Sequence, residues 1–79
     1  MQTPQEVTRK ISIVIKQRRK SLGITQEQLA LSIGIDRTYA SQIERSIANP
    51  SLTVLCKIAI ALKLSLSQLI GEQPIDYQK

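Results

Sequence analysis

Short segments with apolar residues at helical spacing, opened by capping residues and closed by glycine or a turn, fill most of this sequence. Such punctuation limits each helix to a few turns. Thr25-Gln-Glu-Gln28 and Ser65-Leu-Ser-Gln68 fit the capping box, in which the first and last side chains satisfy each other's backbone amides. No segment alternates apolar and polar residues as a strand does. The sequence therefore predicts an all-α fold.

Five helices are expected, and they are separated by recognisable signals. Gly34 supplies a positive-φ end for the second helix, Asp36 precedes the third, Ser51 caps the fourth after the Asn49-Pro50 turn, and Gly71 ends the fifth. The predicted helices span about residues 5–20, 25–33, 37–46, 51–62 and 66–70. Residues 1–79 are interpreted as a single domain with its core at about 5–71. The tail, 72–79, contains Pro74 and is expected to be flexible.

The size and composition of the chain indicate an aliphatic core and a need for a partner. Hydrophobic residues make up 42% of the 79 residues, but aromatic residues only 3%. A domain this short buries only roughly 60% of the surface that its unfolded chain exposes, so its stability is marginal. Sharing apolar surface with a second subunit would raise it. Dimerisation is therefore expected on physical grounds.

The charge is +5, and most of the excess comes from the first predicted helix. No acidic residue separates Glu6 from Glu27. An excess of this kind favours polyanions, with nucleic acid ahead of an acidic membrane surface, because this helix lacks the aromatic anchors of membrane-binding helices. The basic face itself is interpreted mainly as solvated. Its members are Arg9, Lys10, Lys16, Arg18, Arg19 and Lys20.

The chain has one cysteine, Cys56, and no histidine. A zinc site, a disulfide framework and a Cys/His catalytic pair within the chain are therefore excluded, and no enzyme activity, cofactor or small-molecule ligand is expected. Cys56 falls in the apolar pattern of the fourth helix, where we expect a buried small hydrophobe rather than a redox sensor. No apolar run approaches the roughly 20 residues that span a bilayer, and no secretory signal is evident, so a cytoplasmic location is expected.

The second and third helices, joined by a short turn at Gly34, have the lengths of a helix-turn-helix spanning about residues 25–46. In that motif the second helix enters the major groove of DNA, while the first crosses the backbone. Wound at roughly 100° per residue, the third helix gathers its base-reading side chains on one face. These side chains are Arg37, Thr38, Ser41, Gln42 and Arg45.

Several runs make a resemblance specific: Thr25-Gln-Glu-Gln-Leu-Ala, Ile33-Gly-Ile-Asp-Arg-Thr-Tyr, Ile43-Glu-Arg and Asn49-Pro-Ser-Leu. Over about residues 8–71 the chain resembles the Cro and phage-repressor (XRE) family, and most of all the controller proteins of restriction-modification systems. The resemblance implies a lambda-repressor-like domain in a bacterial or phage transcriptional regulator. It also implies a homodimer on a pseudo-palindromic DNA operator that controls its own promoter and a neighbouring gene, with RNA polymerase as a further partner.

The resemblance assigns roles to individual positions. Arg19 and Glu44 match a buried ion pair of the family, and Ser46 stands where the family commonly has glycine. Ala48 stands where a basic residue often precedes the Asn-Pro turn, so one phosphate contact is expected to be missing. The implied base contacts are Arg37, Thr38, Tyr39, Ser41 and Gln42. The implied phosphate contacts are Gln26, Arg45 and Asn49.

The apolar excess of the last two helices is interpreted as a dimer interface. The expected interface residues are Val54, Ile58, Leu66, Leu69 and Ile70. The alternative is an antitoxin-type or phage-repressor-type protein that mainly binds a protein partner. The short segment after Gly71 argues against an extended partner-binding tail.

Overall fold

The structure is a computed structural model that describes residues 2–72, 74 and 75. Its described part is all-helical, as predicted, and contains no strand. No described helix is long and apolar enough to cross a membrane. The five helices are α1 (Pro4–Ser21), α2 (Gln26–Ile33), α3 (Arg37–Glu44), α4 (Leu52–Ala61) and α5 (Leu66–Leu69).

The helix starts follow the capping residues. Thr25 and Ser65 form the predicted capping boxes with Gln28 and Gln68. The sequence analysis missed a third box, in which the Thr3 hydroxyl accepts from the Glu6 amide at 3.2 Å and the Glu6 carboxylate accepts from the Thr3 amide at 2.7 Å. This box starts α1 one residue earlier than predicted. Its signal was present in the sequence as Thr-Pro-Gln-Glu.

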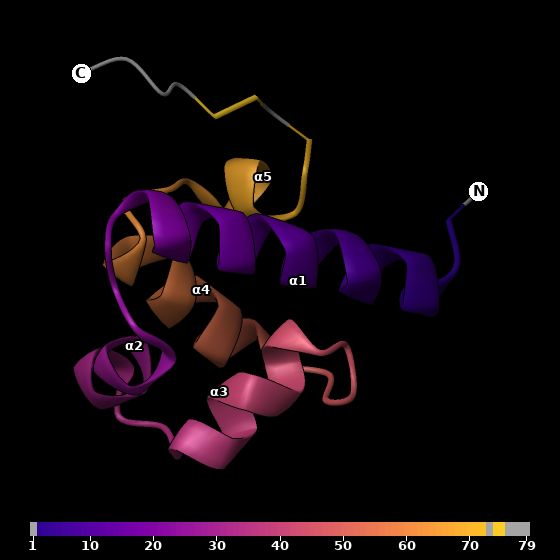
Figure 1. The fold of residues 1–79 in the computed structure, drawn as a ribbon. Coiled ribbons are helices and arrows are strands. Elements are labelled where there is room, and N and C mark those ends of the chain that lie inside the picture. The colour runs from indigo at the N-terminus through magenta and orange to yellow at the C-terminus, as the bar shows by residue number, and fades with distance from the viewer. Residues whose placement is uncertain (1, 73, 76–79) are drawn as a thin grey trace.

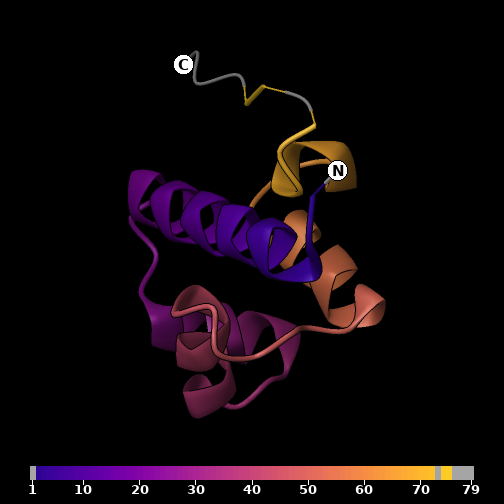
Figure 2. The same cartoon turned by 90° about the vertical axis from the view of Figure 1, so that its right-hand side faces the viewer.

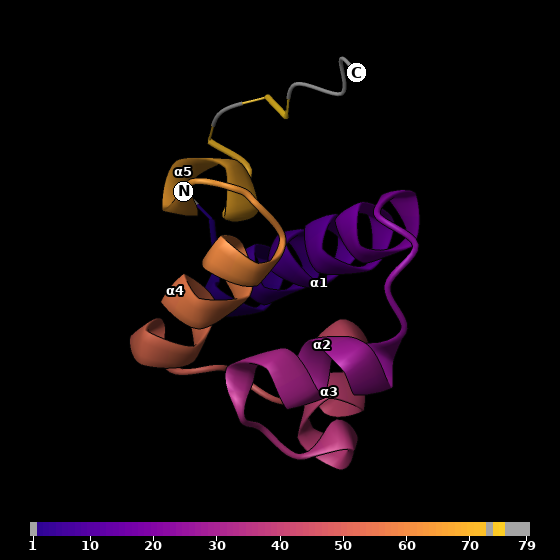
Figure 3. The same ribbon diagram turned by 90° about the vertical axis from the view of Figure 1, so that its left-hand side faces the viewer.

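The long helix α1 lies across the other four (Figure 1). It packs against α3 and α5, while α2 packs against α3 and α4. The α2–α3 pair lies at the end of the molecule opposite α5 (Figures 1 and 3). The segment that connects α3 to α4 runs over the surface beside the N-terminal end of α1 (Figure 2). One end of the molecule is therefore built from α2, α3 and this connection.

The core is aliphatic, as predicted. The largest fully buried side chains are Ile15 of α1, Ile58 of α4, Leu62 directly after α4 and Leu69 of α5. They bring together helices that are far apart in the sequence, and at about 1.5 to 3 kcal/mol for each fully buried aliphatic side chain they contribute much of the stabilisation of so short a chain.

The prediction that Cys56 is buried is wrong, because its side chain is exposed. The core lies under the opposite side of α4, which carries the buried Ile58 and Ala59. Cys56 shares the outer side with Leu52 and Ile60, which are 66% and 77% exposed and stand one turn before and after it. Apolar residues surround much of α4, so the sequence pattern did not indicate which stripe faces inward.

The predicted dimer interface needs a correction at two positions. Ile58 and Leu69 are 1% and 0% exposed within a single chain, so they have no surface to offer a second subunit. They belong to the core instead. Val54 and Ile70 are half-buried and Leu66 is 36% exposed, so these three retain apolar surface.

The third helix ends at Glu44, two residues before the predicted end. Ser46 adopts a φ of 61°, in the left-handed region that stops a helix. It does so at the position where the resemblance led us to expect glycine. The Ser46 hydroxyl lies 2.7 Å from that of the buried Ser12, so a hydrogen bond to α1 stabilises the turn.

Part of the tail is packed rather than flexible. The Gln68 amide donates to the Pro74 carbonyl at 3.2 Å, and Ile75 is half-buried against the core. The expected flexibility of residues 73 and 76–79 concerns positions outside the described residues.

Candidate functional site

The segment from α2 to α3 has the geometry of a helix-turn-helix. Gly34 ends α2 at a φ of 73°, and the Ile35 amide then donates to the Ala30 carbonyl at 3.0 Å, which closes the turn. Asp36 is the N-cap of α3, as predicted, but its side chain makes no capping hydrogen bond. A backbone hydrogen bond, and no side-chain cap, therefore closes the turn between the two helices.

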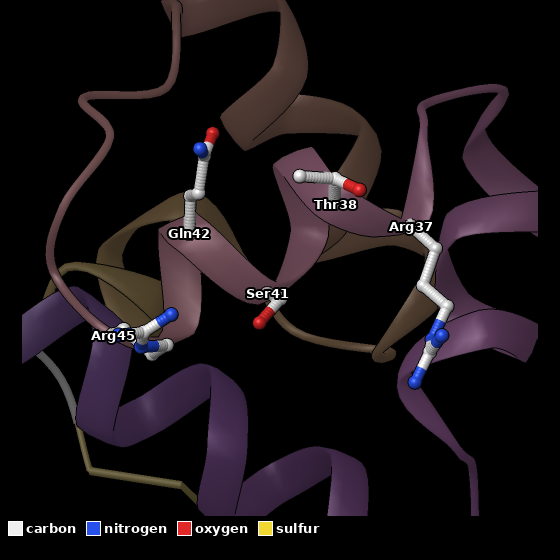
Figure 4. Close-up of a pocket in the computed structure, with 5 residues that line it drawn as sticks. All are labelled: Arg37, Thr38, Ser41, Gln42 and Arg45. Atoms are coloured by element: carbon white, nitrogen blue, oxygen red, sulfur yellow. The ribbon is translucent and has the colours of Figure 1, made fainter.

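The eight residues of α3 divide into a buried and an exposed face. Ala40, Ile43 and Glu44 are buried against the rest of the molecule. The opposite face lines a shallow hollow on the surface, drawn in Figure 4. The residues around this hollow are Arg37, Thr38, Ser41, Gln42 and Arg45. They are the polar set that the sequence predicted for one face of this helix.

Within this face the side chains form two rows. Arg37, Ser41 and Arg45 follow each other at intervals of four residues, with the two guanidinium groups at opposite ends (Figure 4). Thr38 and Gln42 form the neighbouring row and point the other way in the view (Figure 4). Tyr39 does not line the hollow and is half-buried against the core. Its contact with a base therefore stays a prediction.

A buried ion pair joins α3 to α1, as the resemblance implied. Arg19 Nε lies 2.6 Å from Glu44 Oε2, and Arg19 Nη2 donates to Glu44 Oε1 at 3.0 Å. The Glu44 side chain is 1% exposed, and Arg19 Nη1 also donates to the Ile24 carbonyl at 2.8 Å. A bidentate pair in which all three guanidinium nitrogens donate a hydrogen bond fixes α3 against α1. Its role is structural.

Gln26 contacts the same carboxylate. Its amide nitrogen donates to Glu44 Oε1 at 3.1 Å, so the side chain is held against α3 rather than extended into solvent. An amide nitrogen has two protons, and this bond uses one. Gln26 is also the first residue of α2, where backbone amides lack partners within the helix. The predicted phosphate contact therefore has both a side-chain and a backbone donor at this end of α2.

Asn49 lies on the connection between α3 and α4. Its side-chain carbonyl accepts from the Thr8 hydroxyl of α1 at 3.0 Å. The contact attaches this connection to the N-terminal half of α1 and places an exposed Asn49 beyond one end of α3. Arg45 is exposed directly after α3 and lies close to α1 (Figure 4). Arg45 and Asn49 thus follow the C-terminal end of α3, and Gln26 contacts the same end through Glu44.

Comparisons with known proteins agree with this geometry. The helix-turn-helix family model HTH_3 matches residues 15–69. The immunity repressor protein of Bacillus phage phi105 is 41% identical over 61 residues, which are 77% of this chain and 42% of the repressor. The control protein C.MunI of Mycoplasma sp is 40% identical over 57 residues, 72% of this chain and 77% of that protein. The chain thus spans less than half of the phage repressor but most of the control protein.

A solved structure has the same arrangement of helices. It is that of the restriction-modification controller protein C.Esp1396I, a tetramer in complex with its natural 35 base-pair operator. The TM-score is 0.73 at 40% identity, over 84% of this chain and 92% of the controller chain. The chain therefore belongs to the HTH_3 family of XRE-type helix-turn-helix proteins, which are DNA-binding transcriptional regulators.

Proposed function

We propose that this protein is a controller-type regulator that binds a pseudo-palindromic operator as a homodimer and regulates its own promoter and a neighbouring gene. The observation that carries the proposal is the exposed face of α3, where five polar side chains surround one hollow. Arginine at such a position suits the O6 and N7 atoms of guanine, and glutamine suits adenine. Threonine and serine add contacts to base edges or to a thymine methyl group.

Phosphate contacts would flank these base contacts. Gln26 contacts α3 through Glu44, and Asn49 lies on the connection after α3, so both lie beside the reading face. Contacts to phosphate set the register of a helix in the groove but carry no sequence information directly. Specificity in this arrangement comes from Arg37, Thr38, Ser41 and Gln42, with Tyr39 as the further base contact that the resemblance implies.

A dimer supplies the second half of the site. Two copies related by a two-fold axis would present their reading helices to successive major grooves, about 34 Å apart on one face of the DNA. Val54, Leu66 and Ile70 are the predicted interface residues that keep exposed apolar surface in the single chain. The controller C.Esp1396I binds its operator as a tetramer, which supports assembly of copies of this chain on DNA. Operator occupancy would then block or recruit RNA polymerase.

The test is a gel-shift titration against the DNA immediately upstream of the gene for this chain, with a scrambled duplex of equal length as competitor. We expect binding that survives the competitor, and footprinting should show protection of two half-sites related by two-fold symmetry. Specific sites of this kind bind typically 10³ to 10⁷ times tighter than random DNA. Equal affinity for both duplexes would refute sequence-specific autoregulation.

A further inference from the structure

Three basic side chains of α1 form an exposed stripe that the reading surface described so far does not include. They are Arg9, Lys16 and Lys20. No acidic residue lies between Glu6 and Glu27, and within the described residues none of the three forms an ion pair. Glu6 partly balances the charge of Arg9, while no acidic residue of α1 follows Arg9 to balance Lys16 and Lys20.

Two contacts show which side of α1 faces α3. Ser12 lies against Ser46 just after α3, and Arg19 binds Glu44 within α3. At roughly 100° per residue, the stripe lies within about 80° of Ser12 around the helix axis. The buried Ile11 and Ile15 lie in the opposite rotational direction from Ser12. The stripe consequently faces solvent on the flank of α1 that adjoins α3.

The adjoining edge of α3 is the row Arg37, Ser41 and Arg45. On the circumference of α3 this row comes directly after Glu44, the residue that contacts α1. Figure 4 shows α1 passing along this side of the row, with Arg45 close to it, and the two helices pack against each other. A second, polar hollow begins here, and its lining includes Arg9, Ser46 and Asn49. A basic stripe and a reading face thus share one continuous surface.

We propose that Arg9, Lys16 and Lys20 bind phosphates of the DNA backbone along the edge of the groove that α3 enters. This inference rests on the proposed function, because it assigns a second row of contacts to the same DNA. The connection after α3 carries the uncharged Ala48 before Asn49, and Arg9 places a cation in the hollow that Ser46 and Asn49 line. Lysine and arginine on phosphate release counterions, which adds affinity without sequence preference.

The chain offers a matched control for this stripe. Lys10 lies on the side of α1 away from α3, Lys57 lines a hollow between α2 and α4, and Lys63 follows α4. All three are exposed. Changing three cations to glutamine in either set lowers the net charge from +5 to +2. Any difference between the two variants therefore comes from the position of the charges.

The experiment measures the dissociation constant of wild type, Arg9→Gln/Lys16→Gln/Lys20→Gln and Lys10→Gln/Lys57→Gln/Lys63→Gln on the upstream and scrambled duplexes at several salt concentrations. Each lost phosphate contact should lower the slope of log affinity against log salt by about 0.9. If all three residues contact phosphate, the affinity ratio of wild type to stripe variant should be roughly 40 times larger at 50 mM than at 200 mM salt. Thermal unfolding shows whether the stripe variant is folded, and the three single variants show how much each position contributes to the slope.

The stripe variant should lose affinity on both duplexes and have a lower salt slope, while the control variant keeps the wild-type slope. Equal slopes for the two triple variants would overturn the assignment, because charge alone would then explain the effect. The proposed function fails on a different observation, namely a wild-type protein that binds the upstream and scrambled duplexes equally. A reduced slope on both duplexes would in that case still support the stripe as a phosphate-binding surface.

Discussion

Ser46 is a serine in a backbone conformation that favours glycine. Its φ of 61° costs an L-residue roughly 1 to 2 kcal/mol, but its hydroxyl bonds to that of Ser12, which is 4% exposed. Hydrogen bonds of this kind contribute about 0.5 to 1.5 kcal/mol each. The side chain thus offsets the strain of the backbone that carries it.

Two substitutions separate these effects. Ser46→Ala keeps the strain and removes the hydrogen bond, so it should lower the free energy of unfolding by about 1 kcal/mol. Ser46→Gly removes both, and its stability should lie closer to that of the wild type because the two changes oppose each other. Urea denaturation measures both. An alanine variant as stable as the wild type would show that the hydroxyl contact does not stabilise this turn, and one at least as stable as the glycine variant would show that the backbone strain is not relieved by glycine.

The residues proposed to contact bases and those proposed to contact phosphates should respond differently to substitution. Arg37→Ala should cost about 1 to 3 kcal/mol of discrimination at one base position in each half-site. Gln26→Ala should weaken binding by a similar factor on every sequence, because a phosphate contact carries no base preference. Binding to a panel of singly substituted operators measures both effects. A uniform loss for Arg37→Ala would remove its role in base recognition.

The sequence predicted which residues of this surface belong together but not all of their contacts. The spacing of Arg37, Ser41 and Arg45 places them on one face of any helix, so their row follows from periodicity. The hydrogen bond of Gln26 to Glu44 joins residues 18 apart in the sequence, and only the packing of α2 on α3 brings them together. The resemblance supplied the Arg19–Glu44 pair, which no local pattern indicates.

At the scale of helices, local signals predicted where each helix begins better than which side it buries. A capping residue acts on amides within three positions, so Thr25 and Ser65 were readable from the sequence alone. Burial depends on the partners of a helix. Cys56 shows the difference, since the apolar residues of α4 surround much of the helix and only packing selects the inner stripe.

Removing one partner of the ion pair between α1 and α3 should destabilise the protein more than removing both. Glu44→Ala leaves Arg19 buried without a counter-charge and should cost about 3 to 5 kcal/mol. The double variant Arg19→Met/Glu44→Leu removes both charges and should recover much of that loss. Chemical denaturation compares the two. A single variant within about 1 kcal/mol of wild type would contradict the structural role.

The first turn of α1 should respond to acid through Glu6. The Thr3 amide donates to its carboxylate and holds the pKa of Glu6 below its ordinary value. A lowered pKa in the folded state means that the stabilisation is complete above the ordinary pKa and is lost as the pH falls through the lower value. The Thr3 amide proton shift should therefore titrate below the midpoint of an unstructured glutamate. In Glu6→Gln this titration should be absent.

At the scale of the whole molecule, the proposed dimer depends on the apolar surface that a single chain leaves exposed. Leu66→Glu places a charge on a side chain that is already 36% exposed, so the monomer should fold while the dimer dissociates. Leu31→Glu is the control, because Leu31 is 76% exposed on α2, at the end opposite α5. Sedimentation velocity should show a monomer for the first variant and a dimer for the second. The reverse result would place the interface near α2.

The number of helices and the aliphatic core were predictable because both depend on patterns within one chain. The dimer surface was predicted less well. Ile58 and Leu69 carry the same apolar signal as Leu66, but the chain itself covers them. Apolarity in a sequence does not distinguish a side chain that packs within its own chain from one that packs on a partner.

The division of α3 into two faces also bears on how such proteins acquire new operators. Ala40, Ile43 and Glu44 hold the helix in place, whereas none of the polar side chains around the hollow on its other face forms a side-chain hydrogen bond or ion pair among the described residues. The outward residues can therefore be exchanged for those of another regulator without disturbing the scaffold. Retargeting this protein by engineering, or the divergence of its relatives toward different promoters, needs changes at only a few codons.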